Sequence, residues 1–131
     1  MIQEDISLRC HCGLDQFYKQ CCGAIITGES VAITAQSLMR SRYSAFVDSD
    51  EDYLLATWHP QTRPSKVRFS SDQRWLGLAI KSTRGGLEDD EEGQVEFVAR
   101  YKIAGKGYRL HEHSRFKKIE GMWYYLDGEH L

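Results

Sequence analysis

Two short cysteine pairs, Cys10-His11-Cys12-Gly13 and Cys21-Cys22-Gly23, organise the N-terminal part of this chain. The chain has four cysteines, and all of them lie in these two pairs. Core thiols placed by packing alone would be more dispersed, so the four residues indicate a single site. Structural Zn²⁺ is held by four thiolates in a tetrahedron, at roughly 2.3 Å each. The glycine after each pair gives the backbone the freedom to turn back around such an ion.

The eight residues between the pairs are too few to build a core of their own. Residues 15–20 predict a single helical turn, on which Phe17 and Tyr18 form a small apolar plug beside the metal. In such a segment, metal binding supplies the folding free energy that a core would otherwise supply. His11 is a further metal-ligating side chain, but with four thiols available we expect it to face solvent.

Two disulfides are the alternative interpretation of four cysteines. Bridges within a pair would be strained, which leaves the two cross-pairings between the pairs. The stretch Met1–Asp5 has neither the basic nor the apolar region of an export signal. We therefore expect a cytoplasmic protein, in a reducing compartment where clustered thiols bind metal rather than oxidise. The predicted cofactor is structural Zn²⁺, held by Cys10, Cys12, Cys21 and Cys22.

Two helices are predicted after this loop. Residues 24–34 read as a connection, whose alternating apolar residues pack the metal loop against its neighbour. Apolar residues then recur every three or four positions over 35–47, which predicts a helix with Thr34 as its N-cap. Ser49 with Asp52 three residues later resembles a capping box that begins a second helix.

The C-terminal half changes to a period of two, which is typical of strands. The predicted strands are residues 73–83, 94–103, 108–119 and 122–127. Short glycine-containing connections between them require antiparallel neighbours, that is, a meander. Helices followed by such a sheet predict an α+β fold in which the helices cover one curved face. The acidic run 88–92 reads as a solvated hairpin tip.

The alternation in the third predicted strand places polar residues on its apolar side. Glu112 and Ser114 share the parity of Phe116 and are predicted to face inward, whereas His111 and His113 face outward. A carboxyl group in that position would be desolvated unless arginine, histidine or hydroxyl groups contact it. In the last strand the same rule places Trp123, Tyr125 and Asp127 on one face.

Composition limits the classes of function. The chain has 131 residues, of which 41% are hydrophobic, enough for one globular domain with a small appendage. Its net charge is −2 at pH 7, so no overall positive charge attracts it to nucleic acid or to an anionic membrane. Its apolar runs are far shorter than the ~20 residues that span a bilayer. On this basis we expect neither a nucleic-acid partner nor a membrane partner.

Several stretches resemble known families. The cysteine pairs, with Tyr18 and Lys19 between them, resemble the SEC-C motif, a zinc module also found at the C-terminus of the bacterial preprotein translocase ATPase. Four further stretches resemble the YchJ family: Leu38-Met39-Arg40-Ser41-Arg42-Tyr43-Ser44-Ala45-Phe46, Thr57-Trp58-His59-Pro60, Trp75-Leu76-Gly77-Leu78 and Trp123-Tyr124-Tyr125-Leu126-Asp127-Gly128. In that family a SEC-C motif precedes a domain similar to the nuclear transport factor two fold, also called SnoaL-like.

The resemblance implies two units, a SEC-C-like motif over residues 1–28 and a SnoaL-like α+β domain over residues 29–131. The chain departs from the family pattern in two ways. His11 replaces the usual proline after the first cysteine, and the second, C-terminal SEC-C copy of many members is absent. A role that needs two zinc modules is therefore not expected.

A SnoaL-like domain also implies a cone-shaped pocket, in which a carboxylate or histidine can act as a general acid or base. The candidate catalytic groups are Glu112, Asp127 and His59. The candidate pocket residues are Tyr43, Trp58, Trp75, Tyr101, Ser114 and Tyr125. The alternative interpretation, which we favour, is a structural Glu112 that pairs with Arg42 or Arg40.

The principal functional hypothesis is a zinc-binding adaptor. The SEC-C-like motif would present Phe17, Tyr18 and Lys19 to a protein or ribosomal partner, as the similar module of the translocase does for an export chaperone and the ribosome. The alternative is a small-molecule binder or enzyme that uses Glu112 in the pocket. Exposed aromatic residues in the motif favour the first hypothesis, and a cavity that reaches an unpaired Glu112 favours the second. Dimerisation through the open face of the sheet is compatible with both.

Overall fold

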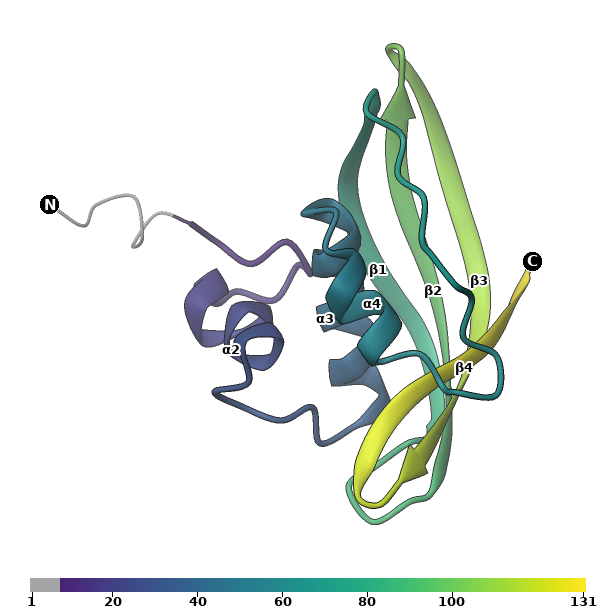
Figure 1. Cartoon of the computed structure of the whole chain (residues 1–131). Helices are drawn as coiled ribbons and strands as arrows, with labels where there is room; N and C mark the ends of the chain where they lie inside the picture. The colour runs from purple at the N-terminus through teal and green to yellow at the C-terminus, as the bar shows by residue number, and fades with distance from the viewer. Residues whose placement is uncertain (1–7) are drawn as a thin grey trace, which may run out of the picture.

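The computed structural model describes residues 8–131, and the Met1–Asp5 stretch that bears on the export prediction lies outside them. Figure 1 shows the helices on one side of a long twisted sheet. No helix in the described part of the chain is both long and apolar enough to cross a lipid bilayer. The elements are the 3₁₀ helix η1 (Tyr18–Gln20), the α-helices α2 (Cys22–Thr27), α3 (Ala35–Val47) and α4 (Glu51–Ala56), and the strands β1 (Gln73–Gly85), β2 (Glu92–Ile103), β3 (Lys106–Ile119) and β4 (Met122–His130).

The four strands form one antiparallel sheet in the order β1-β2-β3-β4. The β2–β3 hairpin turns at Ala104-Gly105 and the β3–β4 hairpin at Glu120-Gly121, and all four residues have positive φ. Positive φ at both central positions matches the right-handed twist of the flanking strands, which is why such two-residue turns close hairpins. The predicted α+β class and meander are confirmed, and each predicted strand extends two or three residues further at one end.

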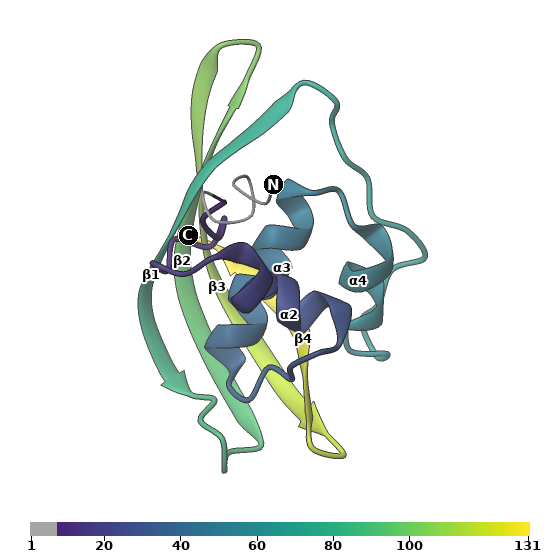
Figure 2. The ribbon, with the colours of Figure 1, turned by 90° about the vertical axis from the view of Figure 1, so that its left-hand side faces the viewer.

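Helix α3 covers the concave face of the sheet (Figure 2) and carries the main core. Its N-terminus is the predicted Thr34, whose hydroxyl accepts a hydrogen bond from the backbone N–H of Ser37 while the Ser37 hydroxyl accepts one from the N–H of Thr34. This reciprocal arrangement satisfies two backbone donors that the first turn leaves unpaired. The buried core residues are Ala32, Ala35, Leu38, Met39, Tyr43, Val95, Phe97, Ala99, Phe116 and Trp123.

The start of α3 lies very close to the β1–β2 hairpin. The backbone N–H of Ala35 donates a hydrogen bond to the carbonyl of Gly86 at 2.9 Å. A Cβ at Gly86 would lie 2.7 Å from the Cβ of Ala35. Only glycine permits this approach, and it lets the hairpin hold the helix end against the sheet.

The sequence prediction was wrong about the cap of α4. The carboxylate of Asp50, not the hydroxyl of Ser49, accepts the hydrogen bond from the backbone N–H of Tyr53, at 3.1 Å. Ser49 has a φ of 55° and belongs to the turn after α3. Serine and aspartate are both preferred N-caps, so a run of such residues leaves the position of the helix start ambiguous by one residue.

The connection predicted for residues 24–34 is partly helical. Helix α2 begins at Cys22 and ends at Thr27, and Gly28 terminates it with a φ of 90°. A helix of six residues shows too few turns for a clear apolar period, so the sequence pattern resembled an irregular connection.

Asp127 does not share a face with Tyr125, contrary to the parity argument. In the β3–β4 pairing Phe116 faces Tyr125 and Arg115 faces Asp127, so Leu126 is an extra residue on β4. Such a bulge shifts the register by one and moves every later side chain to the opposite face. Asp127 consequently lies on the outer face of the sheet, where it pairs with Arg115.

The cap of α4 can be tested directly. Asp50→Ala should lower the free energy of unfolding by about 1 kcal/mol, because the N–H of Tyr53 loses its acceptor. Urea denaturation followed by circular dichroism measures this change. Asp50→Asn keeps an acceptor and should retain most of the stability. A larger loss in Ser49→Ala than in Asp50→Ala would contradict this assignment.

Candidate functional site

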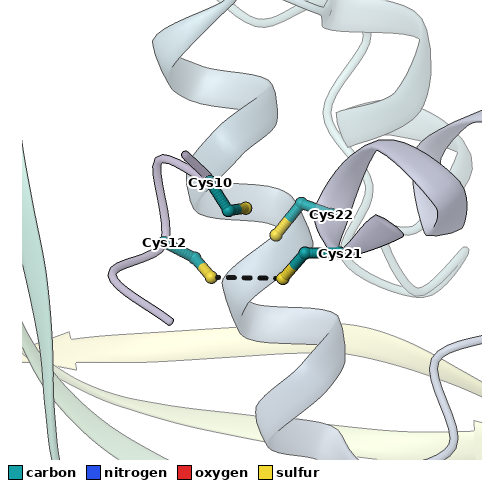
Figure 3. A group of neighbouring side chains, drawn as sticks. All are labelled: Cys10, Cys12, Cys21 and Cys22. Carbon is teal, nitrogen blue, oxygen red and sulfur yellow. Dashed lines mark hydrogen bonds between the residues drawn. The ribbon is translucent and has the colours of Figure 1, made fainter. Parts of the chain in front are cut away.

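The four cysteine side chains converge between the N-terminal loop and helix α2 (Figure 3). Their sulfur atoms all lie within 4.8 Å of one another. The Sγ atoms of Cys12 and Cys21 are 3.7 Å apart. All four are free thiols, so neither of the two disulfide cross-pairings is present. Cys10, Cys12 and Cys22 are buried, and Cys21 is half-buried at the surface of the cluster.

The dimensions of this cluster fit a four-thiolate metal site. Four sulfur atoms at roughly 2.3 Å from a central ion form a tetrahedron with edges of about 3.8 Å. The Cys12–Cys21 separation already has this length, and the remaining separations need to close by at most about 1 Å. Burial raises the pKa of Cys21 to about 12, whereas hydrogen bonds from Cys12 and Cys22 lower that of Cys10. A bound cation would stabilise all four residues as thiolates, which are the ligand form.

The cysteine cluster is attached to α3 by several polar contacts. The guanidinium of Arg40 donates a hydrogen bond to the carbonyl of Cys12 at 2.7 Å. The Sγ atom of Cys10 lies 3.9 Å from the hydroxyl of Ser44, within sulfur hydrogen-bonding distance. At the end of α3, Asp48 accepts a hydrogen bond from Tyr18 at 3.3 Å and lies 3.4 Å from the Nε2 atom of His11. His11 therefore links the cluster to α3, and does not simply face solvent as predicted.

Gly23 has a different role from the one that the sequence indicated. It lies inside α2 and does not provide a turn after the second cysteine pair. Instead, a Cβ at this position would lie 2.7 Å from the carbonyl oxygen of Tyr18 and 2.8 Å from its ring. The missing side chain lets Tyr18 pack against α2 beside the cysteines. Gly13 does adopt the left-handed conformation expected of a turn, with a φ of 93°.

A cavity of about 130 Å³ lies between α3 and the sheet. Its wall is mainly aromatic and apolar, with one cation and one carboxylate. The lining residues are Met39, Arg42, Tyr43, Phe46, Trp58, Trp75, Phe97, Ala99, Leu110, Glu112 and Tyr125. Walls of this kind with few polar groups are typical of small-molecule sites.

The two charged residues of the cavity do not form an ion pair with each other. Glu112 is 9% exposed, and one of its oxygens, Oε2, accepts hydrogen bonds from Ser114 at 2.6 Å and from Tyr125 at 3.2 Å. Arg42 is 2% exposed and donates through Nη1 to the carbonyl of Leu54 and to the hydroxyl of Thr57. The ion pairs within 4.0 Å among residues 8–131 do not include Arg42 with Glu112. The expected pairing of Glu112 with Arg42 or Arg40 is therefore absent.

Aromatic rings stabilise the buried guanidinium instead. The Cζ atom of Arg42 lies 5.0 Å from the ring centroid of Trp58 and 4.6 Å from that of Tyr125. Such cation–π contacts are strongest where water is excluded. Burial lowers the pKa of Arg42 to about 10, so the residue remains charged at neutral pH. Burial and the nearby Glu112 raise the pKa of Tyr125, which keeps its hydroxyl protonated as a donor.

The predicted site residues divide into three groups. Tyr43, Trp58, Trp75, Tyr125 and Glu112 line the cavity. Ser114 and Tyr101 lie behind the wall: Ser114 binds Glu112, and the Tyr101 ring packs on Trp75 with centroids 5.2 Å apart. Asp127 and His59 are not among the lining residues.

Both of these distant residues have structural contacts. Asp127 forms a two-point ion pair with Arg115, at 2.7 and 2.6 Å. The Nδ1 atom of His59 accepts a hydrogen bond from the backbone N–H of Gln61, and the backbone N–H of His59 donates one to the carbonyl of Tyr125. Glu112 is therefore the one predicted acid or base that reaches the cavity.

Comparison with known proteins agrees with this architecture. The family model "YchJ, middle NTF2-like domain" matches residues 34–128, most of the chain. The chain belongs to the YchJ family. A UPF0225 protein of Bordetella pertussis is 52% identical over 123 residues, covering 92% of this chain and 91% of that protein. A UPF0225 protein of Chromobacterium violaceum is 50% identical over 123 residues, covering 91% of this chain and 90% of the relative.

Two solved structures resemble this YchJ-family chain over most of its length. A SEC-C motif containing protein from Rhodopseudomonas palustris has a TM-score of 0.81 and 31% identity, and the match covers 93% of this chain and 98% of that one. A SEC-C motif containing protein from Psychrobacter arcticus has a TM-score of 0.77 and 28% identity, covering 94% and 82%. The four-cysteine cluster is thus the SEC-C motif of this chain, placed before an NTF2-like domain.

Several cavity residues were not identified from the sequence. Met39, Phe46, Phe97, Ala99 and Leu110 were recognisable as apolar positions of a helix or strand, but the pattern did not separate cavity wall from packed core. Arg42 was considered as a partner of Glu112, and the sequence did not identify the contacts that keep it buried. A charged residue on a helix usually reaches solvent. Hydrogen bonds to Leu54 and Thr57, with the rings of Trp58 and Tyr125, retain Arg42 inside.

Gly23→Ala tests the packing of Tyr18 beside the cysteine cluster. The added methyl group would contact the Tyr18 carbonyl, so we expect a loss of about 1–3 kcal/mol in the free energy of unfolding. Thermal or chemical denaturation of the purified protein measures the loss. Gly28→Ala is the matched control: no atom lies within 4 Å of its added Cβ, so its effect reports strain at positive φ alone. Equal losses in the two variants would contradict the role given to Gly23.

Proposed function

We propose that the protein binds a small, ring-sized molecule in the cavity between α3 and the sheet, and that a structural zinc ion holds its SEC-C motif against α3. The observation that carries the first part is the unpaired arrangement of Arg42 and Glu112. Both are buried at one apolar cavity, and neither neutralises the other through a direct contact. Burying opposite charges without pairing them carries a desolvation penalty in free energy. A ligand that contacts both groups would offset part of that penalty.

The cavity volume restricts the size of the ligand. A cavity of about 150 Å³ lined by apolar side chains holds a benzene-sized molecule, and the volume here is close to that value. The rings of Trp58, Trp75 and Tyr43 supply surfaces for a planar apolar group. The ligand class is therefore a single ring with a short polar substituent.

The unused polar atoms restrict the chemistry of that substituent. Within residues 8–131, Nε and Nη2 of Arg42 donate no hydrogen bond, and Oε1 of Glu112 accepts none. A ligand that fits both offers an acceptor to Arg42 and a donor to Glu112. An uncharged amide has both groups, whereas a carboxylate would be repelled by Glu112 and an ammonium by Arg42.

The chemistry of the cysteine cluster favours zinc as the metal. Four thiolates in a near-tetrahedral arrangement select Zn²⁺ or an iron–sulfur centre over hard cations such as Mg²⁺. With all four positions filled by Cys10, Cys12, Cys21 and Cys22, no coordination position remains for substrate. The zinc would be structural, and we assign binding rather than catalysis to the protein.

The adaptor hypothesis remains a second candidate, supported by the surface beside the motif. Phe17 and Tyr18 are half-buried, and Tyr18 is hydrogen-bonded to Asp48, so these two rings offer less surface than the hypothesis requires. Leu14, Val31 and Ile33 are 39%, 54% and 54% exposed, and they line one shallow groove at the motif. A protein or ribosomal partner would contact this groove.

Native mass spectrometry tests the zinc assignment. Protein purified without added metal should carry one zinc ion, and its denatured mass should correspond to four reduced thiols. Cys12→Ser should lower zinc affinity by more than about 100-fold, since even changes beyond the direct ligands cost 10–100-fold. Ser82→Ala, whose hydroxyl binds Glu96 and not the cysteine cluster, leaves the ligands and their contacts in place and serves as the control. A denatured mass four protons short would indicate two disulfides and contradict the proposal.

Three benzene derivatives test the ligand class. Benzamide should quench the fluorescence of Trp58 and Trp75 saturably with a Kd on the order of 1 mM, which corresponds to about −4 kcal/mol. Benzoate and benzylamine, of the same size but charged, should bind at least about tenfold more weakly because each meets one like charge. Similar affinities for all three compounds, or no saturation by benzamide, would contradict the proposed class.

Substitution of Glu112 tests whether its carboxylate contacts the bound ligand. Glu112→Gln should weaken benzamide binding about tenfold, since a hydrogen bond to a charged group contributes about 1.5–3 kcal/mol. Glu96→Gln is the matched control, because that carboxylate binds His111 on the outer face of the sheet and lies outside the cavity wall. Equal effects of the two substitutions would exclude Glu112 as the contact.

A further inference from the structure

Four cations lie side by side on the outer face of the sheet, at the end where β1 begins and β2 ends. Arg74 on β1 is directly opposite Lys102 on β2. Arg100 on β2 is directly opposite Arg109 on β3. Residues paired in register point to the same face, and Arg100 and Lys102 share a parity that is opposite to that of the buried Ala99. We call Arg74, Arg100, Lys102 and Arg109 the cationic patch.

No acidic group neutralises the cationic patch. All four residues are exposed, and none makes an ion pair or side-chain hydrogen bond within the described residues 8–131. Two acids elsewhere on the outer face already have partners: Glu96 binds His111 and Ser82, and Asp127 binds Arg115. A third, Glu129, lies on β4 opposite His113.

Folding alone does not account for this arrangement. Like charges directly opposite each other on neighbouring strands destabilise a sheet, and the patch contains two such pairs. The acidic residues 88–92 lie at the far end of the same β1–β2 hairpin, about 30 Å away at roughly 3.3 Å per residue. Opposite charges are therefore separated along the sheet, beyond the screening length of about 10 Å at 0.1 M salt.

The net charge of −2 conceals this separation. The sequence argument against a nucleic-acid partner used the net charge of the whole chain. The meander brings together cations from three strands that are up to 35 positions apart in the chain, from Arg74 to Arg109. Binding of a polyanion depends on the local electrostatic potential at this surface and not on the net charge of the whole chain.

We propose that the cationic patch binds the phosphate backbone of a single-stranded nucleic acid. Three of its four residues are arginines, whose planar forks match phosphate oxygens. The patch lies on strand surfaces, and it has no protruding helix of the kind that enters a duplex groove. Tyr108 at the same hairpin end is 40% exposed and stacks on Tyr101, with ring centroids 5.4 Å apart, but both rings share the parity of Ala99 and lie on the face opposite the cationic patch. A flexible single strand that bends around the hairpin end can contact the patch and extend that stack, whereas a stiff duplex cannot.

Fluorescence anisotropy with a labelled 20-nucleotide oligouridine RNA tests the proposal on the full-length, metal-loaded protein. Four phosphate contacts on a single strand predict a slope of log K against log salt of about −2.8. Raising the salt concentration from 50 to 200 mM should therefore weaken binding about 50-fold. Salt-independent binding, or no binding at 50 mM salt, would overturn the proposal.

The double substitution Arg74→Glu with Arg100→Glu separates recognition from folding. Each change turns a like-charge cross-strand pair into an opposite-charge pair, so the thermal midpoint should not fall. RNA affinity at 50 mM salt should drop at least tenfold. Lys81→Glu with Arg84→Glu makes the same change in net charge nearer the acidic end of β1 and should change affinity less than about twofold. Equal losses in the two double variants would refute the patch as the binding surface.

Two other polyanions complete the test. A 20-base-pair duplex RNA should bind no more tightly than the single strand, because Tyr108 cannot stack on paired bases. Vesicles containing phosphatidylserine should not sediment the protein at the same salt concentration. Preference for the duplex would contradict the single-strand assignment, and binding to vesicles but not to RNA would identify a membrane surface in its place.

Discussion

Helix α3 is packed on opposite sides at once, and the rest of the structure depends on this. One side contributes Leu38, Met39 and Tyr43 to the core against the sheet. The other side holds the cysteine cluster through Arg40 and Ser44. A helix with only one partner could rotate or slide to accommodate a substitution, but one contacted on both sides has a fixed position. The cavity and the metal site therefore share a single rigid support.

This fixed position explains how an arginine can be buried without an acid. Arg42 has two acceptors for Nη1, and its guanidinium contacts the adjacent rings of Trp58 and Tyr125. Together these contacts replace much of its hydration, although burial still lowers its pKa. Glu112 is likewise held by hydroxyl groups of Ser114 and Tyr125 and not by a cation. The two charges remain separate because each has neutral partners, which leaves both available at the cavity.

Much of the architecture could be read from periodicity. The helix over 35–47, its Thr34 cap and the four antiparallel strands follow from local patterns that the structure confirms. The inward position of Glu112 also follows from parity in an uninterrupted strand. Errors arose where one residue changes the register: the cap at Asp50 and the extra residue Leu126 on β4. A bulge has no reliable signal in a single sequence, yet it moved Asp127 off the face that it was predicted to share with Trp123 and Tyr125.

The sequence by itself determined the four cysteines of the cluster, the order of the elements and the family, because these depend on residue types at short spacings. Only the tertiary structure decided which charges meet. It separated Arg42 from Glu112, paired Asp127 with Arg115 and placed Arg74 opposite Lys102. Electrostatic interactions act over a few ångströms between residues far apart in the chain. Their partners are set by strand register and helix position, which are properties of the whole fold.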